Sequence, residues 1–202
     1  MNKIFFQNQH ITPSKVVCVG RNYVEHIKEL NNEMPSQMVL FNKPNSSITN
    51  TLYYFSPMHR YEGELCFLIE NKQIVAIGFG LDLTNKEAQE YAKSKGLPWE
   101  RAKAFDNSAV FSEFIAFSGD LKDISFKLWI NKELKQEGNY DLMIYKPATI
   151  LKEIQSFMHL EDGDIIMSGT PKGVGNYKKG DIFEAKIYEN DKVILSCSFK
   201  AQ

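Results

Sequence analysis

The sequence has 202 residues, with 24 Lys and Arg against 25 Asp and Glu, so its formal net charge is −1. This length suits one domain, 1–202, with a large core, and the small charge gives no reason to expect nucleic acid or an anionic membrane as a partner. No apolar run approaches the roughly 20 residues that span a bilayer. The three cysteines, Cys18, Cys66 and Cys197, lie far apart in apolar runs, which favours reduced thiols in a cytoplasmic protein.

Short runs of β-branched and aromatic residues, bounded by turn residues, predict strands along most of the chain. Helices are fewer and are expected around 23–30, over about 85–95 and near 148–158. A strand-rich chain without regular β–α–β alternation indicates an α+β, mostly β fold. The predicted strands cover 15–20, 38–43, 64–70, 74–83, 124–131, 164–169, 181–190 and 192–200.

Two of these helices have recognisable starts. Thr84 and Glu87 have the spacing of a capping box, and Gly96 suits the position just after the last turn of the same helix. Asn22 and Glu25 give the helix at 23–30 a similar start.

Two glutamates, Glu62 and Glu64, stand two apart where an apolar run begins. Residues two apart in a strand point to the same face, so their carboxylates are expected side by side. Such a pair by default lies at a solvated strand end, but a carboxylate carried into apolar surroundings must be paired or coordinated. A hard divalent cation would satisfy both glutamates if Asp82, after the next strand, supplied a third oxygen ligand.

Other polar residues have both an ordinary and a functional interpretation. His26 and Glu29 are expected on one face of the first helix, where either the histidine is solvated or Glu29 orients it as a general base. Lys103 is by default an exposed lysine. The Gly-rich segment 168–175 lacks the P-loop pattern, so it is a tight connection or a loop that holds a small anion with Thr170.

Two other classes of function fit parts of this pattern. Glu62 and Glu64 could be the acid and the nucleophile of a retaining glycosidase, which holds its carboxyl groups about 5–5.5 Å apart and works without metal. A non-enzymatic module could bind an anion with the loop that contains Thr170. The glycosidase interpretation gives Asp82, His26 and Lys103 no role, and the binding module does not require the pair of His26 and Glu29.

Six segments in this order resemble the fumarylacetoacetate hydrolase family, and in particular its short acylpyruvase and oxaloacetate decarboxylase branch. The resemblance covers about residues 14–190 and depends on the order of the motifs more than on any one of them. The segments are VCVGRNYVEHIKEL, VLFNKP, YEGEL, LDLTNKEAQ, KGLPWERAKAFDNSAVFSEFI and SGTPKGVG.

The resemblance implies a mixed β-roll or barrel-like fold of the fumarylacetoacetate hydrolase type, with a few short helices, assembled as a homodimer. It implies Mg²⁺ bound by Glu62, Glu64 and Asp82, with Mn²⁺ as an alternative and Ca²⁺ as a stand-in in a crystal. The family usually has an arginine at the position of Lys86, and lysine does not grip a carboxylate bidentately. The implied catalytic residues are His26, Glu29 and Lys103, and the implied substrate contacts are Arg21, Lys43, Lys86, Gln89, Gly169 and Thr170.

The activity implied first is hydrolysis of a carbon–carbon bond in small acylpyruvates (2,4-diketo acids), giving pyruvate and a carboxylic acid through a metal-stabilised enolate. Without the attacking water, the same groups would decarboxylate oxaloacetate. With proton transfer alone, they would tautomerise or isomerise a keto acid such as 2-hydroxyhepta-2,4-diene-1,7-dioate. The sequence does not separate these three reactions, which share a small 2-oxo acid as the expected partner.

Overall fold

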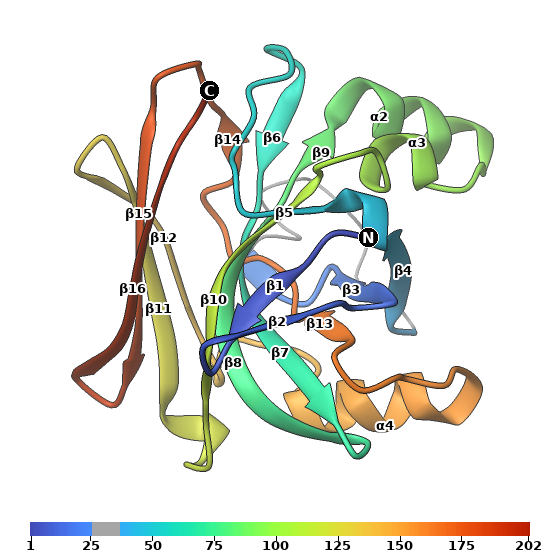
Figure 1. Ribbon diagram of the computed structural model, residues 1–202. Helices are drawn as coiled ribbons and strands as arrows, with labels where there is room; N and C mark the ends of the chain where they lie inside the picture. The colour runs from blue at the N-terminus through green and yellow to red at the C-terminus, as the bar shows by residue number, and fades with distance from the viewer. Residues whose placement is uncertain (26–36) are drawn as a thin grey trace.

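The computed structural model describes residues 1–25 and 37–202. Strands are far more abundant than helices in this part of the chain, which confirms the expected α+β, mostly β class (Figure 1). The strands are β1 Ile4–Phe6, β2 Gln9–Ile11, β3 Lys15–Gly20, β4 Val39–Pro44, β5 Ile48–Thr49, β6 His59–Tyr61, β7 Gly63–Glu70, β8 Gln73–Asp82, β9 Thr84–Asn85, β10 Ala109–Ala116, β11 Ile124–Ile130, β12 Glu133–Asn139, β13 Ile165–Met167, β14 Gly175–Asn176, β15 Ile182–Glu189 and β16 Lys192–Lys200.

Two large sheets and one small sheet make up the β structure. The largest has the order β2-β1-β10-β8-β7-β13-β3-β4, with β5 also paired to β10. A four-stranded sheet, β12-β11-β15-β16, stands beside it (Figure 1), and β14-β6-β9 form the small sheet. Because β7 and β8 are antiparallel neighbours, the start of β7 lies beside the end of β8, with Gly63 opposite Leu81.

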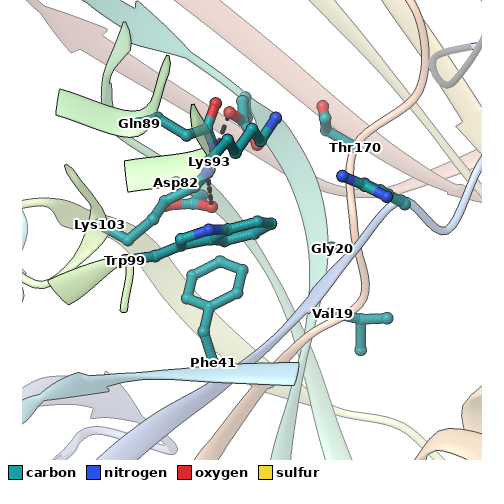
Figure 2. Close-up of a pocket in the computed structure, with 11 residues that line it drawn as sticks. Val19, Gly20, Phe41, Asp82, Gln89, Lys93, Trp99, Lys103 and Thr170 are labelled. Atoms are coloured by element: carbon teal, nitrogen blue, oxygen red, sulfur yellow. Dashed lines mark hydrogen bonds and ion pairs between the residues drawn. The ribbon is translucent and has the colours of Figure 1, made fainter. Parts of the chain in front are cut away.

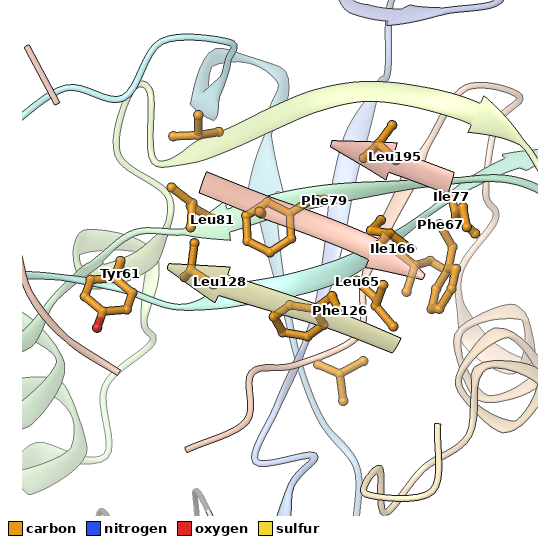
Figure 3. Close-up of a cluster of buried hydrophobic side chains, with 14 of the residues drawn as sticks. Tyr61, Leu65, Phe67, Ile77, Phe79, Leu81, Phe126, Leu128, Ile166 and Leu195 are labelled. Carbon is orange, nitrogen blue, oxygen red and sulfur yellow. The ribbon is translucent and has the colours of Figure 1, made fainter. Parts of the chain in front are cut away.

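The core lies on both faces of the large sheet. From β7, Leu65, Phe67 and Ile69 belong to one hydrophobic cluster, and Cys66 and Leu68 belong to the other. The first cluster also includes Phe126 and Leu128 of the four-stranded sheet, as Figure 3 shows. Burial of one such side chain stabilises the fold by about 1.5–3 kcal/mol, so the strand leading away from Glu64 is firmly anchored in the core.

The helices are α2 Lys86–Lys95, α3 Glu100–Lys103 and α4 Pro147–Phe157. The predicted end of α2 is confirmed, since Gly96 adopts a left-handed conformation with φ of 63°. The predicted N-cap is wrong, because the Asn85 side chain, and not that of Thr84, accepts the hydrogen bond from the Ala88 N–H at 3.1 Å. Among the helices of the described residues, none is long and apolar enough to cross a membrane.

Asn22, the predicted cap of the first helix, has hydrogen-bond partners far along the chain. The Asn22 amide nitrogen donates to the backbone carbonyls of Tyr145 and Ser168, at 3.0 and 2.7 Å, and its side-chain oxygen accepts from the Tyr145 N–H at 2.7 Å. This buried side chain therefore ties the end of β3 to two distant segments. Residues 26–30 of the predicted helix lie outside the described residues.

The sequence analysis missed an eight-residue strand, β10, in the middle of the large sheet. Its register against β8 shifts between Phe111 and Phe114. A shift of this kind breaks the alternation of apolar and polar residues by which a strand is recognised. Each of the three cysteines is a free thiol, as predicted.

Candidate metal centre and active site

Three carboxylates meet where β7 begins and β8 ends. Glu62 immediately precedes β7, Glu64 is its second residue, and Asp82 is the last residue of β8. The Asp82 N–H donates to the Glu62 carbonyl at 2.9 Å, which holds the two strand ends together. One carboxylate oxygen from each of the three residues lies within 4.8 Å of the others, so the structure brings the predicted trio together.

Glu64 is buried among acidic neighbours. It is 2% exposed, and one of its oxygens accepts a hydrogen bond from the Gly169 N–H at 2.7 Å. Burial, with the negative charges of Asp82 and Glu62, raises the pKa of Glu64 well above its ordinary value. A bound cation would relieve this repulsion, because it favours the ionised form.

Position 169 accommodates only glycine. Its φ is +94°, and a Cβ at this position would lie 2.7 Å from the Cβ of Asn22. This backbone aims the N–H at Glu64. Gly169 was predicted to contact substrate, and the structure shows it positioning a carboxylate.

Lys103 lies against the carboxylates, and its default interpretation as an exposed lysine is wrong. Its ammonium is 2.6 Å from an oxygen of Asp82, 2.9 Å from one of Glu62 and 2.6 Å from the hydroxyl of Thr84. Burial alone would lower the pKa of Lys103, but Asp82 and Glu62 raise it above its ordinary value. Lys103 therefore forms two buried ion pairs at the floor of the site.

Lys43 supports the site from behind. Its side chain is fully buried, and its ammonium lies 2.7 Å from the second oxygen of Asp82. The same ammonium donates to the carbonyl and hydroxyl oxygens of Ser108, at 3.1 and 3.0 Å, and to the carbonyls of Leu83 and Lys103. Lys43 does not line the cleft beside the trio, so the structure gives it a positioning role in place of the predicted substrate contact.

A cleft opens over Glu62 and Asp82, with an empty volume of about 430 Å³ that includes its open mouth. Arg21, Gln89 and Thr170, all predicted substrate contacts, line it. Lys103 lines it as well. The other lining residues, which the sequence analysis did not single out, are Val19, Gly20, Phe41, Lys93 and Trp99 (Figure 2).

The structure places the remaining predicted site residues differently. The Thr170 hydroxyl donates to the Gly63 carbonyl at 2.9 Å and accepts from the Gln136 amide at 2.8 Å, so it is fixed in place. Lys86 lies outside the lining and pairs with Glu90 at 3.4 Å along α2. His26 and Glu29 fall outside the described residues, and their catalytic roles stay predictions.

The donor set fits a divalent cation. Carboxylate oxygens are the ligands that Mg²⁺ and Mn²⁺ prefer, and three of them converge here. Lys103 contacts Glu62 and Asp82, while the hydrogen bond to Glu64 comes from a backbone N–H, which carries no net charge. Glu62, Glu64 and Asp82 would hold the cation.

Comparison with known proteins assigns the chain to a family. Residues 15–197 match the family described as Fumarylacetoacetate (FAA) hydrolase C-terminal. The chain belongs to this family. The match includes all three carboxylates, Lys103 and the loop with Gly169 and Thr170.

Three relatives illustrate the range of activities within the family. Oxaloacetate tautomerase YcgM of Escherichia coli (strain K12) is 38% identical, over 83% of this chain and 85% of its own. Oxaloacetate decarboxylase, mitochondrial, of Dictyostelium discoideum is 36% identical, over 87% of this chain and 89% of its own. The crystal structure of fumarylpyruvate hydrolase from Pseudomonas aeruginosa, in complex with Mn²⁺ and pyruvate, superposes with a TM-score of 0.88 at 26% identity and covers 99% of this chain and 95% of that one.

Proposed function

We propose that this chain is a metal-dependent enzyme that interconverts the keto and enol forms of oxaloacetate. The observation that carries the proposal is the buried ammonium of Lys103, shared between two of three converging carboxylates at the floor of an open cleft. The identity of 38% to an oxaloacetate tautomerase supports oxaloacetate as the substrate. This favours the alternative reaction over acylpyruvate hydrolysis, which the sequence analysis placed first.

The reaction needs charge stabilisation at one oxygen. When a proton leaves C3 of oxaloacetate, negative charge develops on the C2 oxygen, which is then protonated to give the enol. A divalent cation held by the three carboxylates would supply a Lewis acid for the 2-oxo acid. A fixed cation that faces developing charge in a cleft stabilises the transition state more than the ground state, and Lys103 is such a cation.

The other residues of the proposal bind the substrate and move its proton. Arg21 and Gln89 line the cleft and present hydrogen-bond donors to a carboxylate. Thr170 also lines the cleft, in a position fixed by its two hydrogen bonds. Lys103 is paired with Glu62 and Asp82, so it is assigned to charge stabilisation, and the role of the base is assigned to His26 with Glu29.

Acylpyruvate hydrolysis is the second candidate, because a fumarylpyruvate hydrolase shares the fold. It needs the same enolate stabilisation and, in addition, a water activated against the distal carbonyl. Decarboxylation of oxaloacetate, the activity named for the Dictyostelium discoideum relative, would use the enolate without that water. A cytoplasmic homodimer remains part of the proposal.

One preparation tested on two substrates distinguishes these reactions. The loss of enol-oxaloacetate absorbance, the release of pyruvate from oxaloacetate and the cleavage of acetylpyruvate are measured with Mg²⁺ and after EDTA treatment. The proposal expects the fastest catalysis for tautomerisation, with loss of that rate in EDTA. Faster cleavage of acetylpyruvate would return the assignment to hydrolysis, and activity unaffected by EDTA would contradict both.

A further inference from the structure

Two cations in the wall of the cleft form no ion pair within the part of the chain that the structure describes. Arg21 and Lys93 both line the cleft, and neither forms a salt bridge to a described residue. The Nε of Arg21 is buried and has no hydrogen-bond partner among the described residues. This contrasts with Lys103 on the floor, which contacts two carboxylates.

Lys93 is held in the wall by packing. It follows Gln89 by four residues on α2, which places both side chains on one face of the helix. Its ammonium lies 5.4 Å from the centre of the Trp99 ring, and this ring packs against Phe41 at 5.8 Å (Figure 2). Burial, Arg21 and Lys103 lower the pKa of Lys93, against the opposing effect of Glu62.

Arg21 is held by its backbone. Its φ is +58°, a strained conformation that non-glycine residues seldom adopt. The buried side chain of the next residue, Asn22, fixes the turn through its three hydrogen bonds to Tyr145 and Ser168. The fold thus maintains a strained turn beside a half-buried lysine of the same charge.

We propose that Arg21 and Lys93 form an anion subsite for the distal carboxylate of a dicarboxylic 2-oxo acid, and that Lys93 sets the preference for dicarboxylates over monocarboxylates. Two partly buried cations repel one another unless an anion lies between them. In the proposed function, the 2-oxo acid end of the substrate binds at the metal site formed by the carboxylates of the floor. The positive charge of the wall would then bind the distal carboxylate. This inference rests on the proposed function for the identity of the ligand, and extends it by assigning Lys93.

The test compares two ligands that differ in the distal carboxylate. Pyruvate lacks this group. The ligand 3,3-difluoro-oxaloacetate carries it but has no C3 hydrogen to lose, so its binding is measured without enolisation. Dissociation constants are measured by titration calorimetry in Mg²⁺ for the wild type, Lys93→Met and Lys93→Arg. Met keeps the apolar stem against Trp99, and Lys95→Met, at an exposed position of the same helix, is the matched control.

The Lys93→Met substitution is expected to weaken binding of difluoro-oxaloacetate by about 10- to 100-fold and binding of pyruvate by less than about threefold. Lys93→Arg should retain binding of the dicarboxylate, and Lys95→Met should change neither ligand. Equal weakening of both ligands, or of neither, would overturn the inference. Lys93→Gln tests the same point if thermal unfolding shows that the Met variant is not folded.

Oxaloacetate turnover by the wild type separates this inference from the proposed function. If the wild type does not tautomerise oxaloacetate while Lys93→Met selectively weakens the dicarboxylate, the proposed function fails and the subsite stands. If turnover is present and Lys93→Met does not discriminate between the ligands, the subsite fails and the proposed function stands.

Discussion

Two buried carboxylate sites lie at opposite ends of β13. Before the strand, the Asp164 carboxylate accepts hydrogen bonds from the backbone N–H groups of Ser14, Lys15 and Glu161, from the Ser14 hydroxyl and from the Lys15 ammonium. After it, the Gly169 N–H donates to Glu64, which is crowded by Glu62 and Asp82. The protein supplies enough donors for the first site and concentrates negative charge at the second.

The pKa shifts of the two sites go in opposite directions. Burial raises the pKa of Asp164, but the hydrogen bonds from Lys15, Ser14 and Glu161 hold it below its ordinary value. At Glu64, burial and the neighbouring carboxylates raise the pKa. The contrast shows that this fold can satisfy a buried carboxylate when the carboxylate serves only structure, so the crowding at Glu64 indicates a ligand that the protein itself does not provide.

The largest effect is expected from removing one charge of the trio. Asp82→Asn should lower turnover by at least about 10³-fold, because the variant loses both a metal ligand and the partner of Lys103 and Lys43. Mg²⁺ affinity, measured by calorimetry, should fall with it. Glu153→Gln, at an exposed position on α4, is the control. Full activity of Asp82→Asn would contradict the role of Asp82 as a metal ligand.

Removing the buried cation behind the trio should affect stability. Lys43→Met leaves Asp82 and several carbonyls without their donor, which should cost about 3–5 kcal/mol of the free energy of unfolding. Denaturant unfolding measures the loss, with the exposed Lys122→Met as the control. A cost below about 1 kcal/mol, the usual size for a surface pair, would show that Lys43 does not hold the site.

Lys103 should affect chemistry more than metal affinity. Lys103→Met is expected to slow turnover by about 10²-fold or more, since it removes the fixed cation that faces the developing charge. Mg²⁺ should still bind, because the variant keeps all three carboxylates and removes a competing positive charge. Loss of Mg²⁺ binding in this variant, measured by calorimetry, would mean that Lys103 only organises the ligands.

The smallest effect is expected at Asp164. Because its pKa is lowered in the folded state, its contribution to stability is complete above the unfolded pKa of about 3.9 and is lost as the pH falls through the lower folded value. Asp164→Asn should therefore cost about 1–3 kcal/mol at neutral pH and flatten the dependence of the unfolding free energy on pH below about 4. Asp191→Asn, in an exposed turn, should leave both unchanged, and an unaltered acid dependence in Asp164→Asn would refute the assignment.

The acidic trio could be predicted from the sequence because its geometry depends on local rules. Glu62 and Glu64 share a strand face, and consecutive antiparallel strands bring Asp82 to the same end. Thr84 was misassigned because its spacing from Glu87 equally fits a helix cap, whereas its hydroxyl donates to Glu62 at 2.6 Å. The Lys103 position came from the family resemblance, and only the structure shows its contacts.

The parts that could not be predicted depend on tertiary packing. Lys93 is one of several lysines along α2, and only the contact with Trp99 from the following segment distinguishes it from exposed Lys95. Asn22 has the sequence signature of a cap, but its partners, Tyr145 and Ser168, are more than 120 residues away. No local pattern encodes contacts at that separation.

The most direct test of the central claim is a Mg²⁺ titration of the stability of the wild type beside that of Glu64→Gln. If the trio binds the cation, Mg²⁺ at 100 times its dissociation constant should raise the unfolding free energy of the wild type by about 2.7 kcal/mol. The same addition should leave Glu64→Gln almost unchanged. An equal shift in both proteins, or none in the wild type, would contradict the assignment of Glu62, Glu64 and Asp82 as a metal centre.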